Sequence, residues 1–211
     1  MTHPDYRNRG LSAKLMNKVL QEYENRYDLM YLFANQSVLD FYPKFGFERV
    51  EEVQFSMDYS WTKPTAGGIR KLDGRDPYHL NFIYRLATER VPVSNRFSTQ
   101  NAQGILMFYC IYIFPDDLYY LEEEDAVIIY TKEGKQIDLY DVISKNEIDI
   151  EAILSRISSK DTSKIVFHYT PDNKNITTKS QVVNGDHVLF VRANGNHKYP
   201  FHVKHPVTSQ A

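Results

Sequence analysis

The strongest constraint on the fold is an amphipathic helix close to the start of the chain, followed at once by a buried strand. Over residues 10–27, apolar side chains recur at every fourth position, a spacing that puts them on one face of a helix. They are Leu11, Leu15, Val19 and Tyr23, with Met16 and Leu20 widening the face. Residues 29–34 form a short apolar run with aromatic side chains, which is typical of a buried strand. Because such a helix must bury its apolar face against another element, we expect helices packed on a sheet.

The residues after this strand predict a short second helix and then a return to strand. Ser37 is suited to cap the helix, with Asp40 three residues later, and Gly46 is suited to end it. Pro43 lacks a backbone donor, so this helix should be short or kinked. Residues 47–59 then read as one or two strands.

A break in composition divides the chain into two predicted domains. Residues 62–68 contain a proline and two adjacent glycines, and they are the predicted linker. The first domain would comprise residues 1–61, and the second, an α/β domain, residues 69–211.

The second domain is predicted to alternate strands and helices. Asp76, followed by Pro77, and Asp149 are each suited to cap the start of a helix. Strands are predicted at Ile69–Leu72, 105–114, Leu118–Leu121, 126–130, 136–142, 165–169 and 187–192. For the whole chain, this order predicts an α/β (α+β) fold with a mixed, mostly antiparallel twisted sheet flanked by helices.

Composition and charge exclude several classes of protein. Hydrophobic residues make up 42% and charged residues 25% of the chain, as in ordinary globular proteins. The formal charge of −2 gives no reason to expect a nucleic acid or an anionic membrane as a partner. No segment has the roughly 20 apolar residues that a membrane span requires, and no secretory signal pattern is present. A cytoplasmic location is therefore expected, and homodimer formation is left open.

Neither cysteine nor histidine points to a metal or redox site. The single cysteine, Cys110, lies inside the apolar run 105–114 and is expected to be a buried thiol. The histidines of the second half lack the spacing of metal ligands, so no metal is predicted. They are His168, His187, His197, His202 and His205.

One acidic run has two interpretations. Glu122-Glu123-Glu124-Asp125 could attract an amine, although such runs more often form solvated turns.

The start of the first helix has the features of an anion site. The segment is Arg7-Asn8-Arg9-Gly10-Leu11-Ser12. Backbone N–H groups in the first turn of a helix have no carbonyl partner within the helix, and the helix dipole adds positive charge there. A phosphate group is the natural ligand of such a site, although a plain helix start has the same pattern. The segment is neither a Walker loop nor a dinucleotide-binding fingerprint.

A second segment completes a resemblance to a known family. Arg7-x-x-Gly10-x-Ser12 is followed by Asn35-x-x-Val38-x-x-x-Tyr42-x-Lys44-x-Gly46-Phe47. Together they resemble the GNAT superfamily of N-acetyltransferases, whose pyrophosphate loop reads Arg/Gln-x-x-Gly-x-Gly/Ala. The similarity covers residues 1–60, and residues 2–6 look like the end of the strand that leads into the loop.

The resemblance implies a function and a role for each matching residue. The backbone amides of Arg7, Asn8, Arg9, Gly10, Leu11 and Ser12 would hold the pyrophosphate of acetyl-CoA. Asn35 would hydrogen-bond the pantetheine arm, and Tyr42 would act as the general acid for the leaving thiolate. The amine acceptor, a small molecule or a protein, would attack the thioester directly. A purely structural role is the alternative for each of these two residues. Tyr42 could be a core tyrosine, and the amide of Asn35 could bond its own backbone.

The sequence departs from the family pattern in ways that leave three hypotheses. Ser12 replaces the usual glycine or alanine, and only six residues precede Arg7, where the family has several strands and helices. No general base can be assigned, and residues 69–211 resemble a degenerate second copy of the same fold. The chain could therefore be an N-acetyltransferase, a non-catalytic CoA-binding module, or a product that lacks the N-terminal part of the acetyltransferase domain.

Overall fold

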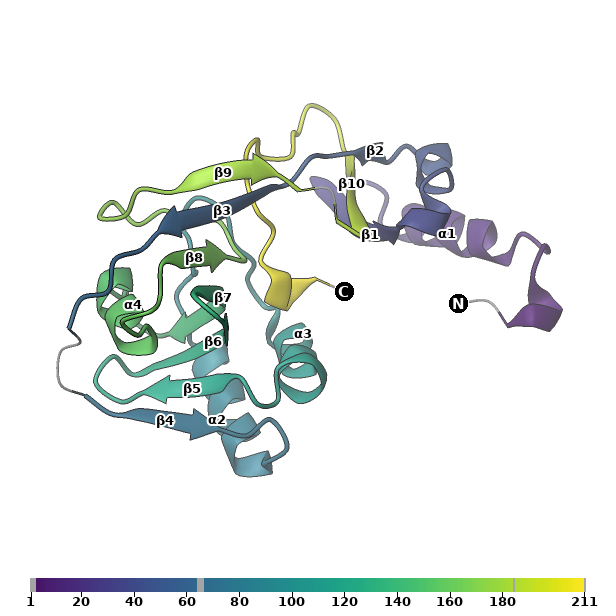
Figure 1. Ribbon diagram of the computed structural model, residues 1–211. Coiled ribbons are helices and arrows are strands. Elements are labelled where there is room, and N and C mark those ends of the chain that lie inside the picture. Colours follow the sequence, from purple (N-terminus) through teal and green to yellow (C-terminus); the bar gives the residue numbers. More distant parts are fainter. Residues whose placement is uncertain (1–2, 64–66, 184, 211) are drawn as a thin grey trace. The chain divides into compact units, whose positions relative to one another are not determined.

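The computed structural model describes residues 3–63, 67–183 and 185–210 (Figure 1). It divides into two compact units, each built from two stretches of chain. Unit 1 comprises Met1–Glu51 and Asn184–Phe201, and unit 2 comprises Glu52–Val183 and His202–Ala211. No helix among the described residues is both long and apolar enough to cross a membrane.

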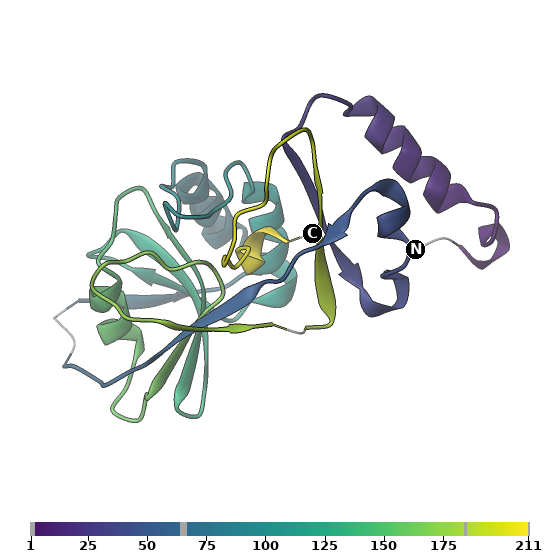
Figure 2. The same cartoon turned by 90° about the horizontal axis from the view of Figure 1, so that it is seen from above.

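Unit 1 is a three-stranded antiparallel sheet with one helix packed on it. The strands follow the order β1 (Leu29–Asn35), β10 (His187–Ala193) and β2 (Glu48–Arg49), so β1 is an edge strand. The central strand β10 therefore comes from the far end of the sequence, with Leu189 opposite Phe33. Met16 and Leu20 of helix α1 (Leu11–Glu22) pack against the small core of this unit. The helix is the long purple one in Figure 2.

Three short 3₁₀ helices complete unit 1. They are η1 (Pro4–Tyr6), η2 (Gln36–Val38) and η3 (Tyr42–Phe45). Asn35 caps η2 through its side chain, and Gly46 ends η3 with φ +78°. Pro43 stands in the first turn of η3, where its missing N–H costs nothing.

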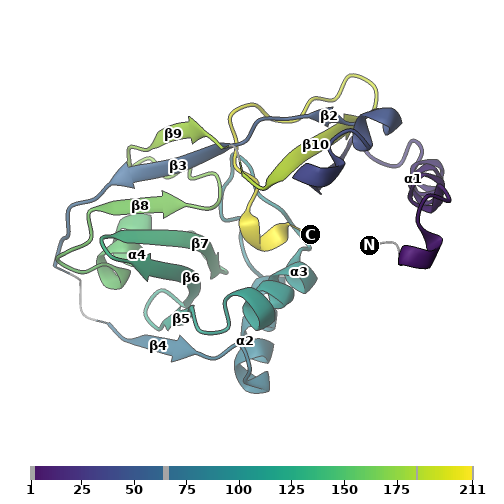
Figure 3. The same cartoon turned by 45° about the vertical axis from the view of Figure 1, so that its right-hand side comes forward.

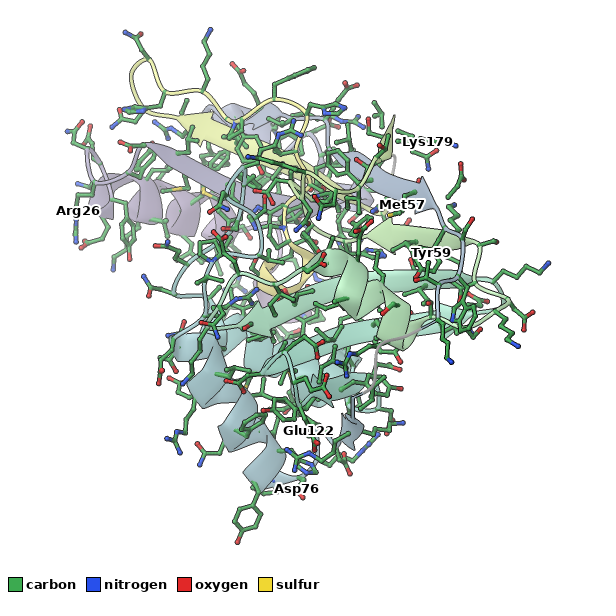
Figure 4. The ribbon with its side chains drawn as sticks, turned by 90° about the vertical axis from the view of Figure 1, so that its left-hand side faces the viewer. Arg26, Met57, Tyr59, Asp76, Glu122 and Lys179 are labelled. Atoms are coloured by element: carbon green, nitrogen blue, oxygen red, sulfur yellow. The ribbon has the colours of Figure 1, made fainter. Side chains whose placement is uncertain are left out.

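Unit 2 contains a seven-stranded sheet of mixed type. Its order is β4-β5-β6-β7-β8-β3-β9, and every described pair is antiparallel except β7 with β8. The bounds are β3 Val53–Asp58, β4 Ile69–Leu72, β5 Leu118–Leu121, β6 Ala126–Glu133, β7 Gln136–Ser144, β8 Lys164–Phe167 and β9 Lys179–Val182. Figure 4 shows Met57 and Tyr59 along and just after β3, with Lys179 of the paired strand β9.

Helices cover both faces of this sheet (Figure 3). Helix α4 (Ile150–Ile157) packs on one face, and it also makes the crossover that a parallel pair such as β7–β8 requires. Helices α2 (Pro77–Thr88) and α3 (Gln103–Phe108) pack on the other face. The C-terminal segment ends in the 3₁₀ helix η5 (Val207–Ser209).

The caps that start α2 and α4 are local and were predictable. The Asp76 carboxylate accepts from the backbone N–H of Tyr78 at 2.7 Å, and that of Asp149 accepts from Glu151 at 3.0 Å. A capping carboxylate is typically worth about 1 kcal/mol to a helix. With these helices and the twisted, mostly antiparallel strands in place, the predicted fold class is confirmed.

One strand prediction is wrong. The apolar run 105–114 is helical: it forms α3 and then a π-helical turn, η4 (Tyr109–Ile113). Leu106, Cys110 and Phe114 are buried together at a spacing of four residues, which is the helical repeat. Cys110 is a fully buried thiol, as predicted, and burial raises its pKa to about 12.

Smaller differences concern element ends. Helix α1 ends at Glu22 rather than near Tyr27, and the predicted helix after Ser37 is two separate 3₁₀ turns. The described residues that precede the phosphate segment form η1 rather than the end of a strand. Strand β9, which is exposed along its length and lacks an apolar pattern, was not predicted.

The two compact units differ from the contiguous division predicted from the sequence. Strand β3 lies in unit 2 although it precedes the predicted linker 62–68, and β10 lies in unit 1. Residues 64–66 of that linker lie outside the described residues. The difference arises because β10 finds its hydrogen-bonding partners in β1 and β2, far away in sequence.

Candidate functional site

The predicted phosphate segment forms an exposed turn into α1. Asn8 has φ +59° and Gly10, the N-cap residue, has φ +68°, so the backbone turns twice through the left-handed region. The first helical hydrogen bond runs from Lys14 N to Gly10 O at 2.9 Å. The N–H groups of the first turn, which come before this bond, have no partner within the helix. The segment therefore presents what an anion site needs: solvent-exposed backbone donors at the positive end of a helix dipole.

A cation stands beside this turn. The Arg9 guanidinium lies 5.1 Å from the centre of the Tyr6 ring in η1. A cation–π contact of this kind restrains an otherwise flexible side chain. It keeps the positive charge of Arg9 near the helix start.

The side-chain oxygen of Asn35 makes structural hydrogen bonds, whereas its side-chain nitrogen remains available as a donor. Its Oδ1 accepts from the backbone N–H of Ser37 at 3.0 Å and from the Ser37 hydroxyl at 2.9 Å. These bonds make Asn35, rather than Ser37, the cap of η2. Its Nδ2 makes no hydrogen bond with any described residue, so a donor remains for a ligand.

Tyr42 opens η3 and is held among aromatic rings. Its ring centre lies 5.3 Å from that of Phe41, 5.8 Å from Phe190 and 6.2 Å from Phe47. The side chain is half-buried, and its hydroxyl makes no hydrogen bond within the described residues. Packing thus fixes the ring while leaving the hydroxyl available.

One cavity of unit 1 brings two of the predicted residues together. It has a volume of about 560 Å³ and is lined by Ser12, from the first turn of α1, and by Tyr42. Its remaining walls are mostly apolar and come from α1, β1 and the segment around η3. They are Leu15, Met16, Val19, Tyr23, Met30, Tyr31, Leu32, Phe41 and Phe47. Arg7, Asn8, Arg9, Gly10, Leu11 and Asn35 do not line it.

The apolar face of α1 is only partly covered because it borders this cavity. Leu15 is 64% exposed and Tyr23 47% exposed, although both belong to the periodic face that predicted the helix. Residues from both faces of the edge strand β1, Met30 and Tyr31, also line the cavity. The cavity therefore reaches the edge of β1 that no described strand pairs.

Tyr31 is a site residue that the sequence did not reveal. It lines the same cavity as Tyr42, and partial burial raises the pKa of its phenol above the ordinary value. Because side chains alternate between the two faces of a strand, the sequence could have placed Tyr31 and Met30 on opposite faces of β1. Nothing in the sequence shows that this tyrosine lines a cavity. Tyr31, like Tyr23, is thus a further phenol in the wall of this cavity.

The acidic run of unit 2 has a structural role. Glu123 and Glu124 both pair with Arg156 of α4, whose side chain is 3% exposed, with 3.0 Å between Nη2 of Arg156 and Oε1 of Glu124. Asp125 accepts a hydrogen bond from the Tyr120 hydroxyl at 2.8 Å. The run is therefore not a plain solvated turn, because it neutralises a buried guanidinium.

Among the described residues, no group of three acidic, histidine or cysteine side chains is placed to hold a metal ion. His168 instead pairs with Asp138 at 2.8 Å, and its ring stacks on Tyr140. This pair and the side-chain hydrogen bond from Gln136 lower the pKa of Asp138 against the opposing effect of burial.

The first part of the chain matches a known family in sequence, and the fold resembles that of solved structures. Residues 1–50 match the sequence model of the acetyltransferase (GNAT) domain. No curated protein matches the chain in sequence.

Similar solved structures cover most of this chain and about half of their own. A conserved protein of unknown function from Enterococcus faecalis V583, described as a probable N-acyltransferase, is 14% identical with a TM-score of 0.52, over 91% of this chain and 52% of that one. Eis1 from Mycobacterium abscessus is 14% identical with a TM-score of 0.52, over 90% and 54%. A GCN5-related N-acetyltransferase from Kribbella flavida is 14% identical with a TM-score of 0.50, over 92% and 50%.

At this identity the likeness to solved structures is one of fold, and the chain spans about half the length of those proteins. The family match of residues 1–50 adds the sequence of the phosphate segment and of the Asn35–Tyr42 region to that likeness. The first fifty residues thus match the acetyltransferase (GNAT) domain in sequence, and the chain shares the fold of these solved structures.

Proposed function

We propose that the chain acts as an N-acyltransferase that uses acetyl-CoA and an amine. The pyrophosphate of CoA would bind at the start of α1, on the backbone N–H groups of residues 7–12. The observation that carries the proposal is the cavity that includes both Ser12, beside this anion site, and Tyr42, the candidate acid. Its apolar walls suit the acyl-bearing end of a pantetheine arm, and the free Nδ2 of Asn35 suits an amide carbonyl of that arm.

The proposed reaction is a direct transfer without an acyl-enzyme intermediate. The amine nitrogen attacks the thioester carbonyl, the new C–N bond forms, and the C–S bond breaks. Tyr42 would donate its proton to the departing thiolate. A base would accept the proton of the attacking amine, and no residue of unit 1 is assigned to this role. An ordinary phenol has a pKa near 10 and a thiol about 8.5, so this transfer is uphill by about 2 kcal/mol, small against the catalytic effect of a placed acid.

The direct test is a titration of acetyl-CoA into the purified protein, with free thiol followed in the presence of a panel of amines. Thiol release that depends on both the protein and an amine is the expected result. Binding of acetyl-CoA without release for any amine would remove the catalytic part of the proposal. Absence of CoA binding would remove the whole of it.

A specific observation favours a second candidate, a CoA-binding module without turnover. No carboxylate or imidazole lines the cavity among the residues described. An amine is mostly protonated at neutral pH, so attack needs a group that accepts its proton. The module hypothesis predicts that CoA binds and that thiol release does not exceed the uncatalysed rate with any amine.

A further inference from the structure

Unit 2 has a polar cavity of its own, with a volume of about 380 Å³. It lies where three connecting segments meet: residues 91–95 after α2, 144–149 between β7 and α4, and 169–175 after β8. Side chains of β7 and of the first turns of α4 complete its wall. A volume of this size is that of a small-molecule site.

A buried phenol in the cavity wall lacks a hydrogen-bonding partner. Tyr169 lines the cavity and is 1% exposed, and its hydroxyl makes no hydrogen bond with any described residue. Its ring packs edge-on against Phe167 at 5.8 Å between ring centres. Burial, together with the nearby carboxylates of Asp141 and Asp172, raises the pKa of this phenol far above its ordinary value, so it stays neutral. A hydroxyl that borders a cavity and has no protein partner is available to a ligand.

Carboxylates dominate the charge around this cavity. Glu147, Asp149 and Asp172 line it, and Lys174 is the one cation in its described lining. One oxygen of Asp149 accepts from the backbone of Glu151, and one oxygen of Asp172 accepts from Asn95 at 2.6 Å. The other oxygen of each, and both oxygens of Glu147, make no hydrogen bond or ion pair with a described residue. Acceptors are therefore left over in a wall with an excess of negative charge.

The arrangement suits an organic cation better than a metal ion or an anion. Among the described residues, no three acidic side chains are close enough together to hold a metal ion. An extended cation can reach carboxylates that are spread around a cavity, because its N–H groups are spread as well. An anion would meet three carboxylates and one ammonium group.

We propose that this cavity of unit 2 binds a small organic ammonium ion, with its N–H groups donating to Asp149, Asp172 and Glu147 and to the hydroxyl of Tyr169. The site needs neither CoA nor the cavity of unit 1. It is therefore a second ligand site, and its test is independent of acetyl transfer.

The experiment is a calorimetric titration of the full chain with spermidine, without acetyl-CoA. One-to-one binding is expected. Tyr169→Phe should weaken it by about tenfold, since a buried hydrogen bond to a charged donor is lost. This variant should keep its fold, because the hydroxyl it removes has no partner among the described residues. Glu147→Gln should weaken binding by about threefold, since this carboxylate is exposed.

Glu151→Gln is the matched control. Glu151 is an exposed carboxylate in the first turn of α4 and does not line the cavity, so its loss should leave the affinity unchanged. Equal losses in Glu147→Gln and Glu151→Gln would show diffuse attraction to an acidic surface and overturn the proposal. Unchanged affinity in a folded Tyr169→Phe variant, or no binding at millimolar spermidine, would also overturn it.

Discussion

Three phenols line the cavity of unit 1, those of Tyr23, Tyr31 and Tyr42, and the latter two come from outside helix α1. Both line the cavity, but they reach it from different elements, η3 and β1. Tyr42 is held by three aromatic rings, whereas Tyr31 stands on the edge strand and is 41% exposed. A general acid must be fixed relative to the leaving group, so the packing favours Tyr42.

Tyr42→Phe tests this assignment at a single atom. We expect turnover to fall by about a hundredfold, because the thiolate would leave without a proton donor, while CoA affinity stays unchanged. Tyr31→Phe, which removes the neighbouring hydroxyl from the same cavity, is the control and should retain most of the activity. Steady-state thiol release and CoA titration measure the two quantities. If the loss follows Tyr31 instead, the acid is Tyr31.

His205 links the stability of unit 2 to pH. It is 1% exposed, and burial, with the nearby charge of Lys204, lowers its pKa to about 4 against the opposing effect of a hydrogen bond that the ring donates to the Ser209 backbone. The facing groups also include the Phe97 ring and the carboxylate of Glu52, which accepts from the His205 backbone. As the pH falls, a histidine in the unfolded chain takes up a proton near pH 6.5, whereas His205 in the folded protein does so only at a much lower pH.

The free energy of unfolding is therefore unaffected by His205 above pH 6.5. It decreases as the pH falls from 6.5 toward 4, because only the unfolded chain binds the proton there. We expect a loss of about 3 kcal/mol across this window, from a pKa difference of about two and a half. Urea unfolding followed by the fluorescence of the single tryptophan, Trp61 in unit 2, measures it. His205→Phe should flatten the dependence. Replacing the exposed His197 by glutamine should leave it intact, and a flat profile in the unaltered protein would contradict the assignment.

At the scale of elements, the start of α1 combines a left-handed backbone conformation with open space. Gly10 has φ +68°, and a Cβ added there would meet no atom within 4 Å. Gly195, in the same unit, has φ +60° and equally open surroundings. The two glycines thus share a backbone conformation and open surroundings, but a ligand is expected only next to Gly10.

This pair makes the anion site testable. Gly10→Ala and Gly195→Ala should each destabilise unit 1 by about 1 kcal/mol, since alanine is disfavoured at positive φ. Only Gly10→Ala should also weaken CoA binding, because its methyl group would occupy the approach to the backbone N–H groups. Calorimetric titration with CoA measures the difference. Equal CoA affinity in the two variants would count against a pyrophosphate at the start of α1.

Elements differed in how far their local sequence determined them. The starts of α2 and α4 were predictable because Asp76 and Asp149 bond to the backbone two residues ahead, a contact that needs no other part of the chain. The run 105–114 was not, because it is apolar on every side and shows no contrast between faces. Within this run, Tyr112 is 70% exposed and Cys110 is buried, but nothing in the sequence pattern distinguishes the exposed positions from the buried ones.

At the scale of the whole molecule, the chain builds unit 1 from its beginning and from a strand near its end. Val188 and Phe190 of β10 lie in the same small core as Ala34 and Phe47. This core has only four buried residues, so each contributes a large share of it. Unit 2 has its own, larger cores.

Phe190→Ala should therefore destabilise a part of the chain that is remote from it in sequence. The cost should be about 3–5 kcal/mol, as for a large side chain removed from a core. Amide hydrogen exchange should lose protection in α1 and β1, while β5–β8 and the Trp61 unfolding midpoint remain unchanged. Phe167→Ala, in the core of unit 2, should do the reverse. Loss of protection confined to residues 69–211 in Phe190→Ala would instead support a contiguous second domain.

The sequence alone determined the features that depend on neighbours along the chain. The amphipathic α1, the caps of α2 and α4, the hairpin of β6 and β7, and the family resemblance of residues 1–50 all rest on local patterns. The tertiary structure decided what depends on distant partners. It placed β10 between β1 and β2, made a helix of the run 105–114, and added Tyr31 to the cavity of Ser12 and Tyr42. The physical reason is that caps and periodicity are short-range, whereas strand pairing and burial are settled only when remote segments compete for the same core.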